Sequence, residues 1–340
     1  MKTALNIFTA VLLIALAGCQ PRATEEQLLG KEKGKELLTV DFQEAQVLRY
    51  RFVSSRNSDL DWDPAKNGSQ PGGNKVDKFT ESMDMVVAYT PIEVDPYGLT
   101  TIKATCESVK VERNPRPGRQ GASRDAAESL AGKSFTLTVD PTGKIEDYSQ
   151  LEKLIHEVGK DAFRQGGRQG RVKEPDMIDD FICSQWFLWD SVASMENALE
   201  GVSVGQSWKS KILIPTSMVI REGRAITYRL DKIRQTNKGR VAVIRSSYSP
   251  AESASSDWPI PYTGSFQMSG TFGFLRTFLR GLKVLNLQGQ GEELFNIDAG
   301  RIEQYNQQYE MQLGAASGSP LPGLNPRITI RQRLTMQILE

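Results

Sequence analysis

The side chains that most often carry chemistry are scarce in this chain, which has one histidine and three cysteines among 340 residues. A metal site built from several imidazoles is therefore excluded, and a hydrolase triad would have to use His156. In LEKLIHEVGKDAF, residues 151–163, apolar side chains recur at helical spacing, and His156 lies next to the apolar stripe. We expect His156 on a solvated helix surface. A hydrolase that uses His156 or a pair of carboxylates remains the alternative interpretation.

Two acidic patterns were considered as sites of cation binding or proton transfer. The three acids of DLDWD, residues 59–63, have the spacing of a calcium loop, which also needs Gly at position six and Glu at position twelve. Those positions hold Pro64 and Gln70, which favours a solvated loop. The adjacent acids Asp179 and Asp180 point apart on a helix. The sequence therefore predicts no catalytic residue, no metal site and no cofactor.

The first cysteine, Cys19, directly follows an apolar run near the N-terminus. Lys2 precedes ALNIFTAVLLIALA, residues 4–17, which has the length of a signal-peptide core and is short of the roughly 20 residues that span a membrane. The run ends in LAGC, residues 16–19, which resembles the lipobox of bacterial lipoproteins. The resemblance implies cleavage before Cys19, diacylglycerol on its thiol and a further acyl chain, such as palmitate, on the new amino group.

Several acyl chains on one residue would anchor the protein firmly, because a single chain binds a membrane only marginally. Gln20 stands where lipoproteins kept at the inner membrane carry aspartate, so the resemblance implies the outer membrane, facing the periplasm. We therefore expect a lipid-anchored cell-envelope protein, with residues 1–18 as signal peptide and 19–40 as tether. Loss of Lys2 with the signal peptide leaves 41 basic and 41 acidic side chains, which argues against nucleic-acid binding.

The elements that would position any site are mostly strands. Apolar and polar residues alternate over long stretches, and turn clusters such as VDPYG (94–98), DPTG (140–143) and TNKG (236–239) separate them. Helical spacing is found in residues 151–163 and 177–199. The pattern predicts a mainly β (α+β) fold, with a large curved antiparallel sheet or half-barrel and two or three helices packed on it. The predicted parts are a first β half (41–150), a helical insertion (151–200) and a second β half (201–340).

Two segments suggest that the β halves are similar to each other. FTLTVDPTGKIEDY, residues 135–148, and FNIDAGRIEQY, residues 295–305, both have a Phe-led strand, an Asp, a glycine turn and then basic–Ile–Glu–x–Tyr. The Asp of each turn can accept hydrogen bonds from the local backbone, and Gly143 and Gly300 can supply a positive φ. A duplication explains this similarity, and two unrelated hairpins are the alternative.

A resemblance to known proteins extends beyond the lipobox. The lipobox together with GKSFTLTVDPTGKIEDY (132–148) and VGQSWKSKILIP (204–215) resembles a poorly characterised class of bacterial lipoproteins with duplicated antiparallel β halves. The overall pattern is also similar to the half-barrel of the lipoprotein carrier and receptor proteins LolA and LolB. Because the shared motifs are turn motifs, the resemblance implies an architecture and no catalytic residue.

Two apolar segments are candidates for the lining of a ligand cavity. DFICSQWFLWDS, residues 180–191, contains Trp186 and Trp189, and TFGFLRTFLRGLK, residues 271–283, presents Phe272 and Phe278 on an apolar face. The alternative for both segments is ordinary packing against the sheet.

The other two cysteines, Cys106 and Cys183, are expected to be small buried hydrophobic residues, although an oxidising compartment would allow them to pair. Taken together, these features predict a non-enzymatic protein held at the membrane by its N-terminal lipid. We expect it to bind an apolar ligand or an envelope partner protein, and no nucleic acid. A hydrolase acting on envelope material is the alternative function.

Overall fold

The computed structural model describes residues 34–62, 76–113, 125–164, 176–196, 200–212, 214–215, 223–251, 282–315 and 326–339. The strands are β1 (Leu48–Asp61), β2 (Val76–Val94), β3 (Thr100–Arg113), β4 (Ser134–Val139), β5 (Ile145–Asp147), β6 (Ser207–Lys209), β7 (Ile214–Pro215), β8 (Gly223–Thr236), β9 (Gly239–Ala251), β10 (Leu282–Asn296), β11 (Arg301–Ala315) and β12 (Arg327–Leu339). The helices are the 3₁₀ helix η2 (Ala126–Leu130) and the α-helices α2 (Ser149–Arg164), α3 (Asp176–Phe187) and α4 (Asp190–Ala193).

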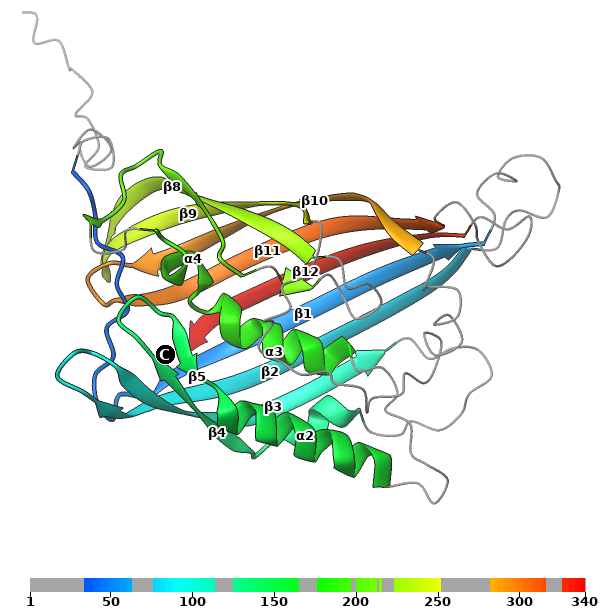
Figure 1. Ribbon diagram of the computed structural model, residues 1–340, viewed down its shortest axis with the longest axis horizontal. Coiled ribbons are helices and arrows are strands. Elements are labelled where there is room, and N and C mark those ends of the chain that lie inside the picture. Colours follow the sequence, from blue (N-terminus) through cyan, green and yellow to red (C-terminus); the bar gives the residue numbers. More distant parts are fainter. Residues whose placement is uncertain are drawn as a thin grey trace, which may run out of the picture.

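All of these strands belong to one antiparallel sheet, in the order β5-β4-β3-β2-β1-β12-β11-β10-β9-β8-β6, with β7 also paired to β8. The two outermost strands, β5 and β6, do not pair with each other within the described chain, so the sheet is open. Figure 1 shows a curved sheet with α2, α3 and α4 over one face. The chain is therefore mainly β, with a large open antiparallel sheet and few helices, as the sequence predicts.

The strand order contains two meanders that run in the same direction across the sheet. One consists of β1 to β5 and the other of β6 and β8 to β11, and β12 lies between them. A duplication would produce this order, with β12 added between the copies. That the halves arose as copies of each other stays a prediction.

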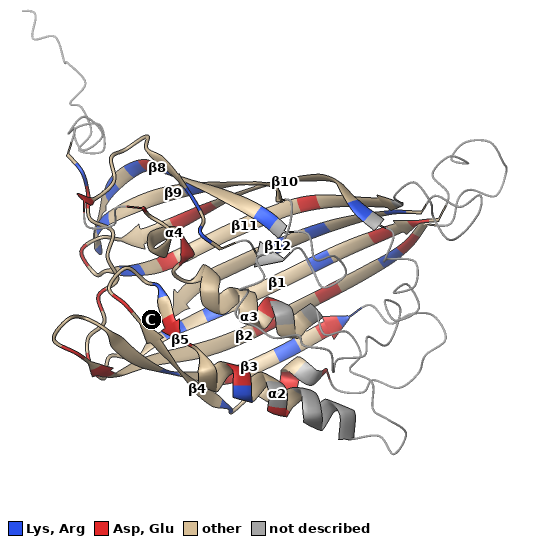
Figure 2. Ribbon diagram, in the orientation of Figure 1, with Lys and Arg blue, Asp and Glu red and all other residues tan. Residues whose placement is uncertain are grey.

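The alternation of side chains along each strand divides the sheet into an inner and an outer face. In β1, Leu48, Tyr50 and Phe52 are buried, whereas Arg49 and Arg51 between them are exposed. Because successive strand residues point to opposite faces, this pattern places one face against the helices and the other toward solvent. Charges of both signs are interspersed over the elements, with no extended region of one sign in this view (Figure 2).

Both turn glycines of the similar segments have the predicted left-handed backbone, with φ of 87° at Gly143 and 55° at Gly300. The segment from Glu36 to Phe42, which we call the strap, packs across both turns. Its Val40 N–H donates to the carbonyl of Pro141 at 2.9 Å, and its Asp41 N–H donates to that of Gly300 at 2.9 Å.

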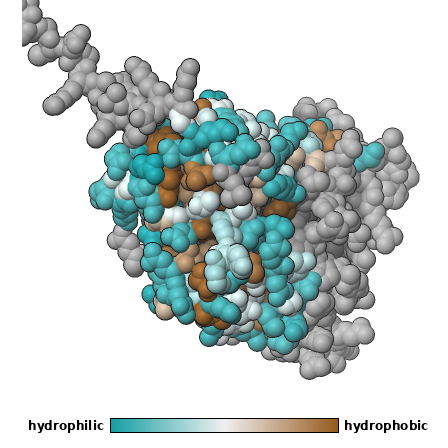
Figure 3. All heavy atoms as spheres, turned by 60° about the vertical axis from the view of Figure 1, so that its left-hand side comes forward, coloured by the Kyte–Doolittle hydropathy of each residue, from teal (hydrophilic) through white to brown (hydrophobic). Residues whose placement is uncertain are grey.

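The strap overlaps the predicted tether, residues 19–40. Leu38, Val40 and Phe42 alternate along it, and all three are buried. The end of the predicted tether therefore belongs to the folded protein. The end of the molecule that carries the strap also exposes apolar side chains among hydrophilic ones (Figure 3). Leu37 of the strap is 51% exposed.

The acidic residues of the two turns have different partners. Asp140 accepts a hydrogen bond from the backbone N–H of Thr142 at 2.8 Å, as predicted. Asp298 instead accepts from the backbone N–H of Arg240 at 2.8 Å, and Asn296 accepts within the turn. The prediction of a local bond for the second Asp is therefore wrong. The reason is that β10 ends at Asn296, so Asp298 lies in the middle of the turn and reaches the neighbouring hairpin.

The cysteines Cys106 and Cys183 are both buried and form no disulfide with each other, as expected of small core residues. Burial raises the pKa of the Cys106 thiol to about 12, so it stays protonated. None of the described helices is both long and apolar enough to cross a membrane.

Candidate functional site

A row of polar side chains crosses the apolar inner face of the sheet. In the strand register Tyr309 lies opposite Gln332, Gln332 opposite Arg56, Arg56 opposite Glu81, and Glu81 opposite Arg113. These five residues, which we call the polar row, come from β11, β12, β1, β2 and β3 and share one level of the sheet. Segments far apart in the sequence meet here, because β1 pairs with the last strand of the chain.

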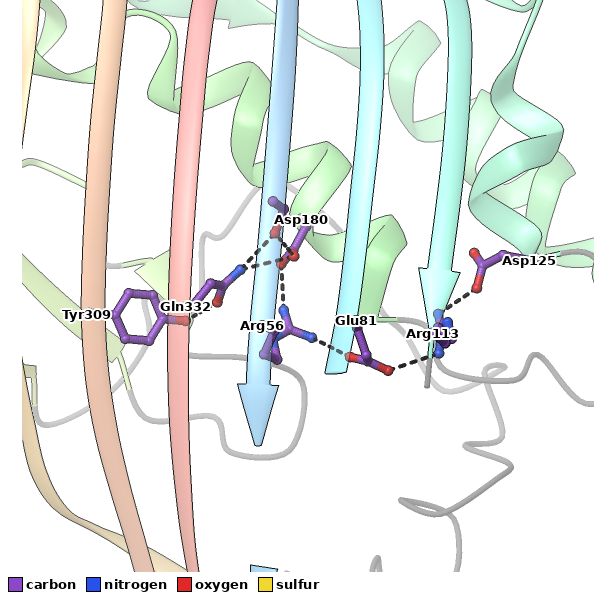
Figure 4. Close-up of polar contacts among 8 residues, drawn as sticks. Arg56, Glu81, Arg113, Asp125, Asp180, Tyr309 and Gln332 are labelled. Carbon is purple, nitrogen blue, oxygen red and sulfur yellow. Dashed lines mark hydrogen bonds and ion pairs between the residues drawn. The ribbon is translucent and has the colours of Figure 1, made fainter. Parts of the chain in front are cut away.

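The charged members of the row and two acids from other elements form a chain of ion pairs (Figure 4). The guanidinium of Arg56, a residue only 2% exposed, bonds Asp180 of α3 at 2.8 Å and Glu81 at 3.3 Å. Arg113 in turn bonds Glu81 at 3.1 Å and Asp125 at 2.5 Å. Positive and negative groups alternate, so each buried charge has a neighbour of opposite sign, as burial requires.

The row also fixes helix α3 on the middle of the sheet. The carboxylate of Asp180 accepts hydrogen bonds from the Ser54 hydroxyl at 2.5 Å and from the Gln332 side-chain amide at 3.0 Å. The Tyr309 hydroxyl donates to Gln332 and completes the network. This arrangement holds the helix over β1 and β12, and every group in it is supplied by the protein itself.

A second buried cluster joins α4 to the second meander. Asp190 accepts hydrogen bonds from the hydroxyls of Tyr228 at 2.6 Å, Ser194 at 2.7 Å and Ser210 at 2.8 Å. Burial raises the pKa of Asp190, and these three donors and the positive charge of Arg224 oppose the rise. The carboxylate thus holds α4 against β8.

Glu293 on β10 belongs to the same cluster and accepts a hydrogen bond from Ser191. Burial raises its pKa to about 8; the Ser191 hydrogen bond acts against this rise, and the charge of Asp190 adds to it. Glu293 is therefore largely protonated at neutral pH. Asp190 and Glu293 form a carboxyl pair of the kind the hydrolase alternative needs, and both are engaged by hydroxyls of the fold. The side chain of His156 lies outside the described part of the chain.

One buried arginine near this cluster has an unusual environment. Arg224 is 2% exposed, and its guanidinium carbon lies 4.7 Å from the ring centre of Tyr309, 4.8 Å from that of Phe187 and 5.5 Å from that of Tyr248. Its Nε has no hydrogen-bond partner. Among the described residues, no carboxylate forms an ion pair with Arg224.

The predicted cavity-lining tryptophans lie in the core beneath α3 and α4. Trp186 is 7% exposed, and its ring packs edge-on to Tyr148 at 5.6 Å. Trp189 is 4% exposed and packs edge-on to Phe42 at 5.9 Å and Tyr89 at 5.8 Å. Of the two, Trp189 packs on Phe42 of the strap. That they line a ligand cavity stays a prediction.

The other predicted site residues, Cys19, Phe272 and Phe278, lie outside the described residues. Within the described ranges, no group of three or more His, Cys, Asp or Glu side chains could hold a metal ion. Asp59 of the calcium-like pattern instead forms an ion pair with Arg331 at 2.8 Å.

The outer face of the second meander has an open depression of about 640 Å³. Its lining includes Arg229, Asp231, Arg245 and Glu292, and Arg245 lies 3.3 Å from Asp231 and 3.9 Å from Glu292. These charges are partly or fully exposed and largely neutralise one another. The depression lacks the apolar lining of most small-molecule sites.

Sequence reasoning missed the polar row, the Asp190–Glu293 cluster and Arg224. One signal was available in β1, where Ser54, Arg56 and Ser58 occupy three successive inward positions between Phe52 and Leu60. Polar residues on the apolar face of an alternating strand must find partners when buried. The partners themselves came from other elements and were not visible in the pattern.

No protein-family model and no curated protein matches the chain. Among solved structures it is similar to lipovitellin, described for its lipid–protein interactions, at 12% identity and a TM-score of 0.46 over 88% of this chain. The chain spans about a quarter of lipovitellin, 26% of its length. It is also similar to DynF of the dynemicin biosynthesis pathway of Micromonospora chersina, at 7% identity and a TM-score of 0.18 over 88% of this chain and 85% of that one. With TM-scores below 0.5, we base no functional statement on these similarities.

Proposed function

We propose that this protein is a lipid-anchored protein of the cell envelope that binds an apolar ligand on the inner face of its sheet and catalyses no reaction. The LAGC sequence supports the anchor on Cys19, and Gln20 supports a position on the outer membrane, facing the periplasm. In this proposal the curved sheet acts as a half-barrel made of two similar β halves. The helices close part of its inner face.

The observation that carries the ligand proposal is the extent of the apolar inner face. In Figure 1 the right-hand ends of β1, β11 and β12 extend past α2, α3 and α4. The inward residues there are apolar and at most 2% exposed, so a ligand would have to replace the atoms that now exclude water from them: Leu60, Met311, Leu313, Ile328 and Ile330. The register places Leu313 opposite Ile328, and Ile328 opposite Leu60, so these side chains form one surface on three adjacent strands.

This surface and the core beneath the helices lie on opposite sides of the polar row. Tyr309 and Gln332 belong to the row, and two residues further along their strands are Met311 and Ile330. A molecule on this surface would therefore have apolar side chains along its length and polar groups at one end. That combination suits an amphiphile with an acyl chain, because burial of each CH₂ contributes about 0.8 kcal/mol. An envelope partner protein is the other occupant considered.

The ligand proposal is tested by native mass spectrometry on the full chain released from membranes. The native mass should exceed the denatured mass by a stoichiometric increment, and an organic extract should contain the corresponding apolar molecule. Equal native and denatured masses, with no such molecule in the extract, would contradict the ligand proposal and favour a partner protein.

The anchor has an independent test. Cells that express the Cys19→Ser variant should incorporate no labelled fatty acid into the protein, and the protein should leave the membrane fraction. A Cys106→Ser variant is the matched control, because its thiol is buried in the sheet and should not affect labelling. Labelling that persists in Cys19→Ser would contradict lipidation at this residue.

A further inference from the structure

Arg224 stands at the start of β8, where its strand neighbours are Ile214 of β7 and Pro250 of β9. Its side chain lies on the inner face, as do those of Ile226 and Tyr228 at the next alternate positions. The residue is 2% exposed, so its cation is withdrawn from bulk water.

The aromatic rings around Arg224 compensate this burial only in part. Contact between a guanidinium and an aromatic face stabilises the cation by less than the cost of burying it, even after relaxation. Rings offer no hydrogen-bond acceptor in the plane of the guanidinium, and the Nε atom has none.

The acidic groups near Arg224 have other hydrogen-bond partners. Asp190 feels the charge of Arg224, but its oxygens accept hydrogen bonds from Tyr228, Ser194 and Ser210. Glu293 is bonded by a serine hydroxyl and is largely protonated at neutral pH, since burial raises its pKa to about 8. Neither carboxyl forms an ion pair with the guanidinium among the described contacts.

We propose that Arg224 binds the anionic headgroup of the apolar ligand. The headgroup chemistry is a carboxylate or a phosphate ester, because a guanidinium pairs with either through two parallel hydrogen bonds. This inference rests on the proposed function and specifies the ligand as an anionic amphiphile.

The position of Arg224 relative to the apolar surface agrees with this role. Its guanidinium packs on Tyr309 of the polar row, and Met311 and Leu313 follow on the same face of β11. The backbone rises about 3.4 Å per residue, so Tyr309 to Leu313 covers about 14 Å. A headgroup at Arg224 would thus allow an acyl chain to extend along β11 over the apolar surface.

Photo-crosslinking on the full-length protein in phosphatidylcholine nanodiscs tests this inference. The probes are a long-chain diazirine fatty acid, the diazirine alcohol of equal length and a diazirine alkyl phosphate, with crosslinked peptides mapped by mass spectrometry. In the wild type the acid or the phosphate should label inner-face peptides of β8–β11 roughly tenfold more than the alcohol, as expected for a charge-assisted hydrogen bond. Arg224→Met should reduce anionic labelling to the level of the alcohol.

Two further variants keep the result interpretable. Arg224→Lys retains the charge without the planar pair of donors and should keep a weaker preference for the anion, which tests the proposal even if Arg224→Met folds poorly. Arg229→Met, on the outer face of the same strand, should label as the wild type does.

The outcomes separate this inference from the proposed function. Equal labelling by acid, phosphate and alcohol in the wild type would overturn the headgroup role and leave apolar binding intact. No inner-face labelling by any probe would contradict the proposed function itself. Loss of anionic labelling in millimolar inorganic phosphate, with alcohol labelling unchanged, would show that the site takes a free anion and would overturn the amphiphile assignment.

Discussion

Two arginines on the inner face of the sheet, Arg56 in the first meander and Arg224 in the second, are buried to the same extent, at 2% exposure each. Arg56 lies between two carboxylates, Asp180 and Glu81. Arg224 lies among three aromatic rings and forms no ion pair with the described carboxylates.

The difference separates a structural role from a binding role. The Arg56 cation is neutralised by the chain itself, and its bonds fix α3 on β1 and β12. The Arg224 cation has no carboxylate partner among the described residues, and the rings around it offer no hydrogen-bond acceptor. A protein that retains such a group is expected to use it on something outside its own chain.

The sharpest test of this comparison is the stability of matched variants of the ligand-free protein. Arg56→Met leaves Asp180 and Glu81 without their shared cation and should lower the free energy of unfolding by about 3–5 kcal/mol. Arg224→Met removes an uncompensated charge and should change it by no more than about 1 kcal/mol, or raise it. Denaturant titration followed by tryptophan fluorescence measures both. Equal losses of unfolding free energy in the two variants would contradict the difference between Arg56 and Arg224.

The next effect concerns Glu293, whose pKa is raised from 4.5 to about 8 by burial. The folded state holds the Glu293 proton more tightly than the unfolded state does. The stability that this proton contributes is therefore complete below the pKa of Glu293 in the unfolded state, and it is lost as the pH rises through the pKa in the folded state. Between about pH 5 and about pH 9 the free energy of unfolding should therefore fall by about 2–4 kcal/mol on account of this residue.

Glu293→Gln is the variant that isolates this effect. The amide remains neutral at every pH and can still accept the hydrogen bond from Ser191. Its unfolding free energy should fall less with rising pH than that of the wild type, and above about pH 8 the variant should be the more stable protein. Thermal unfolding at a series of pH values measures the two slopes. Identical slopes would mean that Glu293 titrates normally.

A smaller effect compares the two turns beneath the strap. Both Gly143 and Gly300 have a positive φ, which alanine adopts at a cost of about 1–2 kcal/mol. A Cβ at Gly300 would also lie 2.6 Å from the backbone nitrogen of Asp41, whereas at Gly143 its close contacts are side-chain atoms of Trp189 and Val40. Gly300→Ala should therefore destabilise the protein more than Gly143→Ala. Amide hydrogen exchange at Val40 and Asp41 should accelerate more in Gly300→Ala, and the reverse order would contradict the packing of the strap.

The smallest effect uses an arginine on the solvent-exposed face. Arg331 lies between Asp59 at 2.8 Å and Glu310 at 2.9 Å, but its side chain is 51% exposed. Arg331→Met should change the free energy of unfolding by no more than about 1 kcal/mol, and less at high salt. A loss as large as that of Arg56→Met would show that the number of ion pairs, and not their burial, governs stability here.

The β class, the helical segments and the two turn glycines could be predicted from the sequence, because alternation, helical spacing and turn chemistry are local properties. The polar row could not, because it depends on the pairing of Arg56 with Gln332, at opposite ends of the chain, and on Asp180 from a helix. The strap was missed because charged neighbours mask the alternation of Leu38 and Val40. Arg224 gave no signal, since its environment comes from rings on three other elements.

The most direct test of the account is the identity of the molecule that copurifies with the full chain. Organic extracts of the wild type, Arg224→Met and the outer-face control Arg229→Met would be compared by mass spectrometry. The account predicts a stoichiometric anionic amphiphile in the wild type and in Arg229→Met, and its loss in Arg224→Met. An extract without an amphiphile, or the same anionic molecule in equal amount from all three proteins, would contradict it.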